Sequence, residues 1–195
     1  LEFRRVLFRS GHDAPDSSVA KPSSVDKHVV TTDDNLVLVF YNITWSNNKM
    51  TGKQNQRHED ALQEDLDFAF HNLDADAVFL SECGEIEYGL RHDLWMKLLS
   101  RIVPARFTSI IHQSHYTSIV DMSRIKILAG PSLRGPMTNL PDHGYRMCQY
   151  LEIKRRDSAD KPIQVFNIHC PASVGRPYGP QGRQDVVNWL KKMRV

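Results

Sequence analysis

Three polar side chains that could do chemistry stand at the ends of short apolar runs in the sequence. They are an amide (Asn42), a carboxylate (Glu82) and an imidazole (His169). In α/β sheets, functional side chains tend to project from the ends of strands. A carboxylate at such a place can bind a hard cation such as Mg²⁺, and an imidazole can exchange a proton near neutral pH. These residues are therefore the first candidates for a site.

Each candidate also has a purely structural interpretation. Glu82 could be a solvated loop residue at the start of the next helix, and Asn42 could be an ordinary turn residue. His169 could be a core histidine whose ring nitrogens are satisfied internally. Arg146 is a fourth candidate, since its forked donors suit a phosphate oxygen, but it could equally be a surface residue. The residues alone leave these alternatives open.

The elements that must position these residues follow from the hydrophobic pattern. Short apolar runs predict strands at 36–40, 77–80, 107–111, 116–120, 125–128, 146–153 and 163–168. Apolar residues at helical spacing predict helices over residues 60–73, 90–102 and 186–193. Polar or Pro/Gly-rich stretches predict loops at 46–59, 130–144 and 175–182. This order is typical of a layered α/β protein with mixed sheets.

The organisation of the 195-residue chain is expected to change twice near its start. Residues 1–10 resemble a translated cloning linker, and residues 11–34, rich in Ser, Asp and Pro, predict a flexible leader. Residues 35–195 would then form one domain. The chain has 25 basic and 23 acidic side chains, and leaving out the first ten residues gives 22 of each. The apparent basicity is therefore no argument for nucleic-acid binding.

Cysteine spacing and hydropathy exclude several classes of protein. Cys83, Cys148 and Cys170 are widely spaced and form no Cys-x-x-Cys pattern, so neither a disulfide framework nor a zinc site is expected. We expect buried or half-buried thiols in a reducing compartment. No stretch approaches the roughly 20 apolar residues needed to span a bilayer. Location is left open, with an intracellular one favoured, and nothing predicts the oligomeric state.

Four segments in order resemble the endonuclease/exonuclease/phosphatase (DNase I-like) superfamily. They are VLVFYNITW, DADAVFLSECGEI, RMCQYLEI and VFNIHCPAS, within residues 36–195. The resemblance implies a four-layer α/β/β/α sandwich with mixed sheets and a magnesium-dependent phosphoesterase, with Mn²⁺ as an alternative metal. It assigns the metal to Glu82 and a phosphate oxygen to Arg146. It has Asn42 orient a phosphate, a metal-bound water or a carboxylate, and His169 hydrogen-bond to or protonate the scissile phosphate.

One departure from that family limits the prediction. The family's Gly-Asp-x-Asn and Ser-Asp-His segments do not occur in this chain. We therefore expect a fragment, truncated at its C-terminal side, that does not hydrolyse phosphoesters at a useful rate. A non-catalytic binding or scaffold protein of the same fold, and an unrelated α/β domain, are the alternatives. The substrate stays undetermined among nucleic acid, inositol phosphate and phospholipid headgroup, because one fold serves all three.

Overall fold

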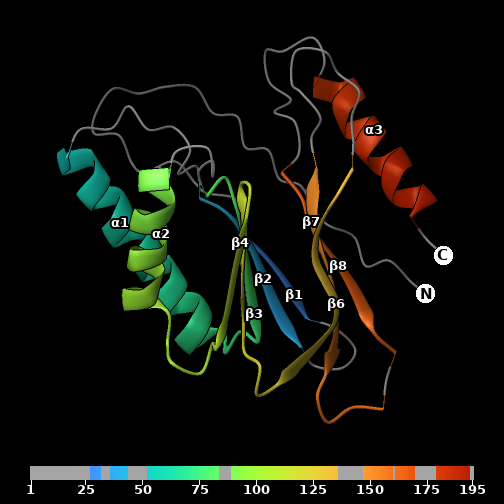
Figure 1. Ribbon diagram of the computed structural model, residues 1–195, viewed down its shortest axis with the longest axis horizontal. Coiled ribbons are helices and arrows are strands. Elements are labelled where there is room, and N and C mark those ends of the chain that lie inside the picture. Colours follow the sequence, from blue (N-terminus) through green and yellow to red (C-terminus); the bar gives the residue numbers. More distant parts are fainter. Residues whose placement is uncertain are drawn as a thin grey trace, which may run out of the picture.

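Four layers of secondary structure make up the molecule (Figure 1). The computed structural model of the chain describes residues 27–31, 36–43, 52–83, 89–135, 147–159, 161–169 and 179–193. Helices α1 (Gly52–Asp67) and α2 (Gly89–Ile102) cover one sheet, and α1 continues into a short π-helical segment, η1 (Phe68–Asn72). A second sheet packs on the first, and helix α3 (Gly179–Lys192) lies against its outer side.

The first sheet is mixed and carries the two earliest candidate residues. Its strand order is β1-β2-β3-β5-β4. The bounds are β1 (Lys27–Thr31), β2 (Val37–Asn42), β3 (Ala77–Ser81), β4 (Ser109–Gln113) and β5 (Tyr116–Val120). β2 and β3 are parallel, so their C-terminal ends reach the same edge, whereas β1–β2, β3–β5 and β4–β5 are antiparallel pairs. Apolar residues fill both faces, as in a sheet covered on both sides.

The second sheet is antiparallel in the described part of the chain. Its order is β6-β7-β8, with β6 (Ile125–Arg134), β7 (Cys148–Arg155) and β8 (Ile163–Asn167). Alternation along β8 turns Val165 toward the first sheet and Phe166 toward α3. The second sheet thus contributes side chains both to the apolar cluster between the sheets and to the smaller apolar cluster under α3.

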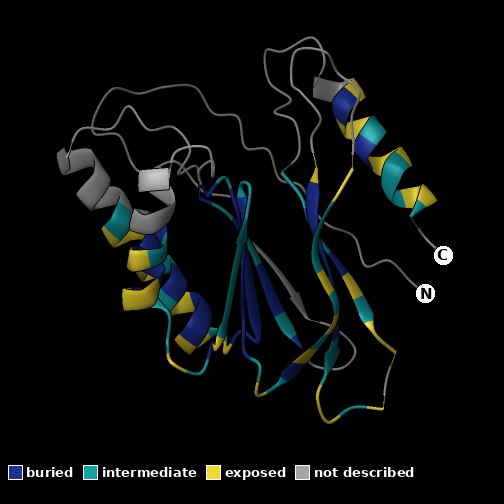
Figure 2. Cartoon of the chain, viewed as in Figure 1, coloured by how far each residue is buried: buried dark blue, intermediate teal, exposed yellow. Residues whose placement is uncertain are grey.

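Three apolar clusters hold the layers together. One joins α1 and α2 to the first sheet and includes Trp95 and Leu66; a second fills the space between the sheets and includes Phe79 and Leu151. A small third cluster lies under α3 around Val186. Figure 2 shows the buried positions gathered on the facing sides of these layers. Each helix and sheet buries one face against its neighbour, which is the arrangement that stabilises layered α/β proteins.

The predicted fold class, a mixed α/β sandwich, is confirmed. None of the described helices is long and apolar enough to cross a membrane. The predicted leader of residues 11–34 is wrong for Lys27–Thr31, because this segment pairs with Val37–Tyr41 as strand β1. The rest of the leader and the predicted linker, residues 1–10, lie outside the described residues.

Three predicted loops are partly regular structure. Helix α1 begins at Gly52 rather than near Asp60, and α3 begins at Gly179, within the predicted loop 175–182. Pro180 favours this start because proline suits the first turn of a helix. β6 continues to Arg134. Its register with β7 shifts between Ile127 and Ala129 and again between Ala129 and Ser132, and the second irregularity accommodates Gly130 and Pro131, residues that usually signal a loop.

Candidate functional site

Asn42, Glu82 and His169 lie side by side at one end of the two sheets. Asn42 is the last residue of β2, in parallel register with Ser81, so Glu82 follows at the same sheet edge. His169 comes two residues after the end of β8. Asn42 Nδ2 donates to Glu82 Oε1 over 3.2 Å, and His169 Nε2 lies 2.5 Å from that same oxygen. The structure therefore brings together three residues separated by up to 127 positions in the sequence, from Asn42 to His169.

The backbone at Glu82 is held in an uncommon conformation. Its φ of +60° is in the left-handed region, which a residue with a side chain rarely adopts. The chain is fixed on both sides: Ile43 N–H donates to Ser81 O over 3.1 Å, and Cys83 N–H donates to His115 O over 3.0 Å. Such conformations persist where the surroundings over-determine them, and they cluster at functional sites. This geometry turns the Glu82 side chain toward the second sheet.

Partial burial strengthens the contacts of the Glu82 carboxylate. The Glu82 side chain is 15% exposed and the His169 side chain 26% exposed. Hydrogen bonds to a carboxylate are stronger than neutral ones, and the effect grows where water is partly excluded. A carboxylate oxygen that accepts from both an amide and an imidazole is held in one orientation. The arrangement can present a fixed negative charge to a cation or to a polar ligand.

The fit of this site to a metal depends on one carboxylate. Among the described residues, no group of three or more His, Cys, Asp or Glu side chains could hold a metal ion. Mg²⁺ often takes only one or two protein carboxylates and completes its shell with water and substrate phosphate oxygens. Glu82 suits that mode of binding. The roles assigned to Glu82, Asn42 and His169 remain predictions, and Arg146 lies outside the described residues.

Two further residues belong to this site, Asn167 and Tyr116. The sequence suggests Tyr116 as a residue that lines the same cleft, with core packing as the alternative, and Asn167 lies in the segment VFNIHCPAS. Asn167 is 2% exposed and Tyr116 is 4% exposed, and both bind backbone atoms of the opposite sheet. One feature of the sequence indicates that Asn167 is buried. Alternation along β8 turns Ile163, Val165 and Asn167 to the same side, and an amide in an apolar row must find a buried partner.

Cys83 follows Glu82 directly, yet its environment makes a poor nucleophile. It is 2% exposed, and burial raises the pKa of its thiol to about 12. Burial also raises the pKa of the Cys148 thiol, to about 11. Since the thiolate is the reactive form, both thiols should be inert near neutral pH.

We expect the thiols of Cys83 and Cys148 to resist a thiol reagent such as DTNB at pH 8 in the folded protein. In a Cys170→Ser variant, where only these two thiols remain, reaction should be slow until denaturant is added. Rapid reaction of one equivalent before unfolding would contradict the burial of these residues.

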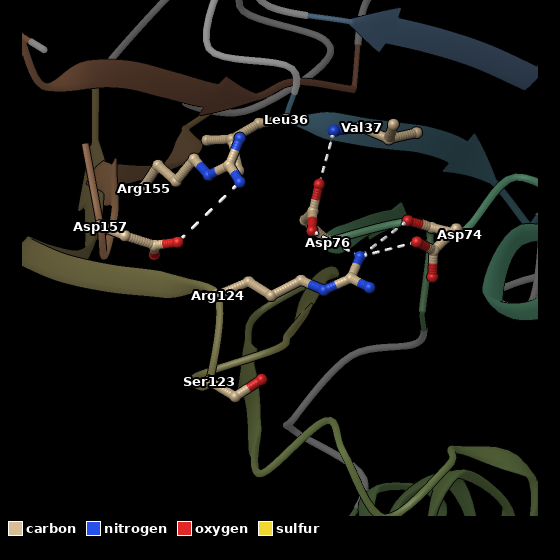
Figure 3. Close-up of a pocket in the computed structure, with 8 residues that line it drawn as sticks. All are labelled: Leu36, Val37, Asp74, Asp76, Ser123, Arg124, Arg155 and Asp157. Atoms are coloured by element: carbon tan, nitrogen blue, oxygen red, sulfur yellow. Dashed lines mark hydrogen bonds and ion pairs between the residues drawn. The ribbon is translucent and has the colours of Figure 1, made fainter.

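A cavity of about 440 Å³ lies at the opposite end of the sheets (Figure 3). Arg124 lies between Asp74 and Asp76 there, with Nη1 at 2.9 Å from Asp74 Oδ2 and 3.0 Å from Asp76 Oδ1. Hydrogen bonds from Arg106 and, to a smaller extent, from Arg124 lower the pKa of the Asp74 carboxyl. The acids of this cavity are therefore bound by arginines, and we interpret the group as a structural network rather than a site.

Comparisons with known proteins show a fold but no family. No protein-family model matches the sequence, and no curated protein matches it. Among solved structures, the crystal structure of D. rerio TDP2 complexed with single strand DNA product is similar, with a TM-score of 0.54 and 11% identity. The match covers 82% of this chain and 56% of that chain, so the present chain spans little more than half of that protein. The likeness confirms the α/β sandwich.

Proposed function

We propose that the chain is part of a magnesium-dependent phosphoesterase of the endonuclease/exonuclease/phosphatase superfamily. The observation that carries the proposal is the contact of Asn42 and His169 with one oxygen of Glu82 at the ends of β2, β3 and β8. The likeness in fold to TDP2, a member of that superfamily, supports it. Four segments of the chain resemble motifs of the superfamily and follow the same order.

In this proposal each side chain has a separate task. Glu82 holds the metal, which when bound neutralises charge on the phosphate and activates water. Asn42 donates to Glu82 Oε1 and so fixes the direction of the carboxylate. His169 Nε2, which lies 2.5 Å from Glu82 Oε1, would hydrogen-bond to or protonate a phosphate oxygen when substrate enters. Partial burial of the pair strengthens each of these contacts.

The residues of this chain would bind metal and phosphate without efficient turnover. The sequence contains neither a Gly-Asp-x-Asn nor a Ser-Asp-His segment, which in the superfamily supply the base and its partners. A non-catalytic binding protein of the same fold is the second candidate, and the same observation favours it. Incubation of the chain with Mg²⁺ and single-stranded DNA, RNA or a phosphoinositide tests the lack of turnover, which both candidates predict. Clear turnover by the purified 195-residue chain would refute the proposed lack of activity.

A nucleic-acid phosphodiester is the substrate class to test first. The similar TDP2 structure contains a single-strand DNA product, and we extend that chemistry to this chain as a proposal. The balance of 22 basic and 22 acidic side chains beyond residue 10 argues against strong non-specific binding. We therefore propose recognition of one phosphodiester at the site rather than of an extended backbone.

Replacement of Glu82 by glutamine should abolish metal binding at the site. Mn²⁺, a paramagnetic substitute for Mg²⁺, should selectively broaden the backbone amide signals of Asn42, Glu82 and His169. Even residues that only support a metal ligand contribute about 10- to 100-fold in affinity, so loss of the ligand should weaken Mn²⁺ binding at least as much. Glu59→Gln is the matched control, because Glu59 pairs with Arg101 on the surface. Equal broadening in Glu82→Gln and wild type would overturn the metal assignment.

A further inference from the structure

The contact between Glu82 and His169 joins two different sheets. Glu82 follows β3 of the first sheet, and hydrogen bonds within that sheet hold the chain on both sides of it. His169 follows β8 of the second sheet. The 2.5 Å separation of Glu82 Oε1 and His169 Nε2 therefore depends on how the two sheets are held relative to each other.

Asn167 bridges the sheets directly behind this pair. Its Nδ2 donates to the backbone oxygen of Leu80 over 2.9 Å, and the contact is buried. Leu80 precedes Glu82 by two residues, and Asn167 precedes His169 by two residues. A shift of one sheet against the other that lengthened the Glu82–His169 contact would also have to strain or break this bond.

Tyr116 makes a second bridge, which involves the backbone of His169. The backbone N–H of His169 donates to the Tyr116 hydroxyl over 3.2 Å, and that hydroxyl donates to Met147 O over 2.6 Å. Tyr116 belongs to β5, whereas Met147 and His169 adjoin strands of the second sheet. One phenol thus ties the first sheet to two segments of the second sheet.

Other contacts also join the sheets, and one of them involves Gln149, which lies opposite Asn167 in the register of β7 and β8. Ser118 donates to Gln149 Oε1 over 2.6 Å, and Gln149 donates to Ile111 O over 3.4 Å. Gln113 Nε2 also donates to Pro131 O over 3.5 Å, and an apolar cluster that includes Phe79 and Leu151 lies between the sheets. Apolar contact is not directional, so it fixes the spacing of the sheets but tolerates small sliding movements. Directional bonds close to Glu82 and His169 are needed to hold their geometry.

We propose that Asn167 and Tyr116 are positioning residues, which form an inter-sheet clamp that sets the separation of Glu82 and His169. The clamp is a property of the folded chain without metal or substrate. Its importance for chemistry rests on the proposed function, because only that function gives the pair a task. A support of this kind matters because small displacements of reacting groups are costly to catalysis.

The clamp can be tested by the proton resonance of His169 Nε2–H, which the contact with Glu82 should shift downfield and protect from exchange. Wild-type protein without metal or substrate should show this signal, and Glu82→Ala provides the reference for a broken contact. Asn167→Ala should lose the signal or move it to the Glu82→Ala position. Tyr116→Phe, which keeps the packed ring and removes only the hydroxyl, should do the same. Crystal structures of the variants would measure the separation directly.

Gln149→Ala is the matched control for the clamp, because it also removes a buried amide that crosses between the sheets. It should keep the His169 signal. The proposal is overturned if Tyr116→Phe and Asn167→Ala both keep the wild-type signal, or if Gln149→Ala loses it equally. If Asn167→Ala does not fold, the His169 signal of Tyr116→Phe alone tests the proposal.

A separate Mn²⁺ titration should show 10- to 100-fold weaker binding in Asn167→Ala, as expected for a residue that supports a metal ligand. Absence of Mn²⁺ binding in wild type would count against the proposed function and leave the clamp standing.

Discussion

Replacing Phe79 by alanine is expected to lower the free energy of unfolding by about 4 kcal/mol, within the usual range for a buried phenylalanine. Phe79 is fully buried on β3, between the two sheets, and its ring stacks on Phe40 with centroids 4.9 Å apart. Truncation removes apolar contact and leaves a cavity in the cluster that joins the sheets. The midpoint of urea unfolding, analysed with an unchanged m-value, measures the loss.

Phe68→Ala is the control for this prediction. Phe68 is the same residue type, but it is 49% exposed on η1, so its truncation should change the free energy of unfolding by less than about 1 kcal/mol. Phe79→Leu should lie between the two and stays measurable if the alanine variant does not fold. Equal losses from Phe68 and Phe79 would mean that the space between the sheets is not the dominant core.

The strands that carry the candidate site could be predicted because their apolar runs are short and continuous. Leu36–Phe40 and Ala77–Leu80 are buried on both faces, which gives a pattern distinct from an amphipathic helix. Once β2 and β3 are parallel, Asn42 and Glu82 must reach the same edge. The position of His169 needs the packing of the second sheet on the first, and only the family resemblance anticipated that.

Elements with little apolar content could not be predicted in the same way. β1 is an edge strand of five residues with only Val29 and Val30 as apolar members, so its pairing with β2 overrides a leader-like composition. The first turns of α1, from Gly52, carry no apolar period. The hydrophobic pattern of a sequence indicates secondary structure only where apolar residues recur, and these two segments contain too few of them to form such a pattern.

Hydrogen bonds between residues far apart in the sequence could not be predicted either. Asn167 and Leu80 are 87 residues apart, and no spacing rule connects them. Asp74 and Asp76 directly follow the helix predicted over residues 60–73, and that position indicates no partner for them. In the structure they bind Arg124, 50 and 48 residues away. Polar side chains in a sequence show that partners are needed when they are buried, but the fold decides which partners they find.

Replacing Asp76 by asparagine is expected to lower the free energy of unfolding by about 2 kcal/mol, the range for a hydrogen bond to a charged group. Asp76 is 4% exposed; its Oδ2 accepts from Val37 N–H over 2.8 Å and its Oδ1 from Arg124. Asparagine can still accept from Val37, but it removes the buried charge nearest to the Arg124 guanidinium, which also contacts Asp74 and Asp121. Urea unfolding at neutral pH measures the change.

Asp74→Asn is the control, because it removes a carboxylate that binds the same Arg124 but is exposed. The Asp74 side chain is 60% exposed, so comparison with Asp76→Asn shows how much burial adds to the effect of losing the charge. Asparagine also tolerates the positive φ of 49° at this position, so the substitution adds no backbone strain. Water screens and replaces an exposed ion pair, and the loss should stay below about 1 kcal/mol. If Asp74→Asn costs as much as Asp76→Asn, the exposed pair contributes as strongly as the buried one. The end of the sheets opposite Glu82 would then be held by the whole network of Arg106 and Arg124, which also includes the buried Asp121, rather than mainly by the buried Asp76 that precedes β3.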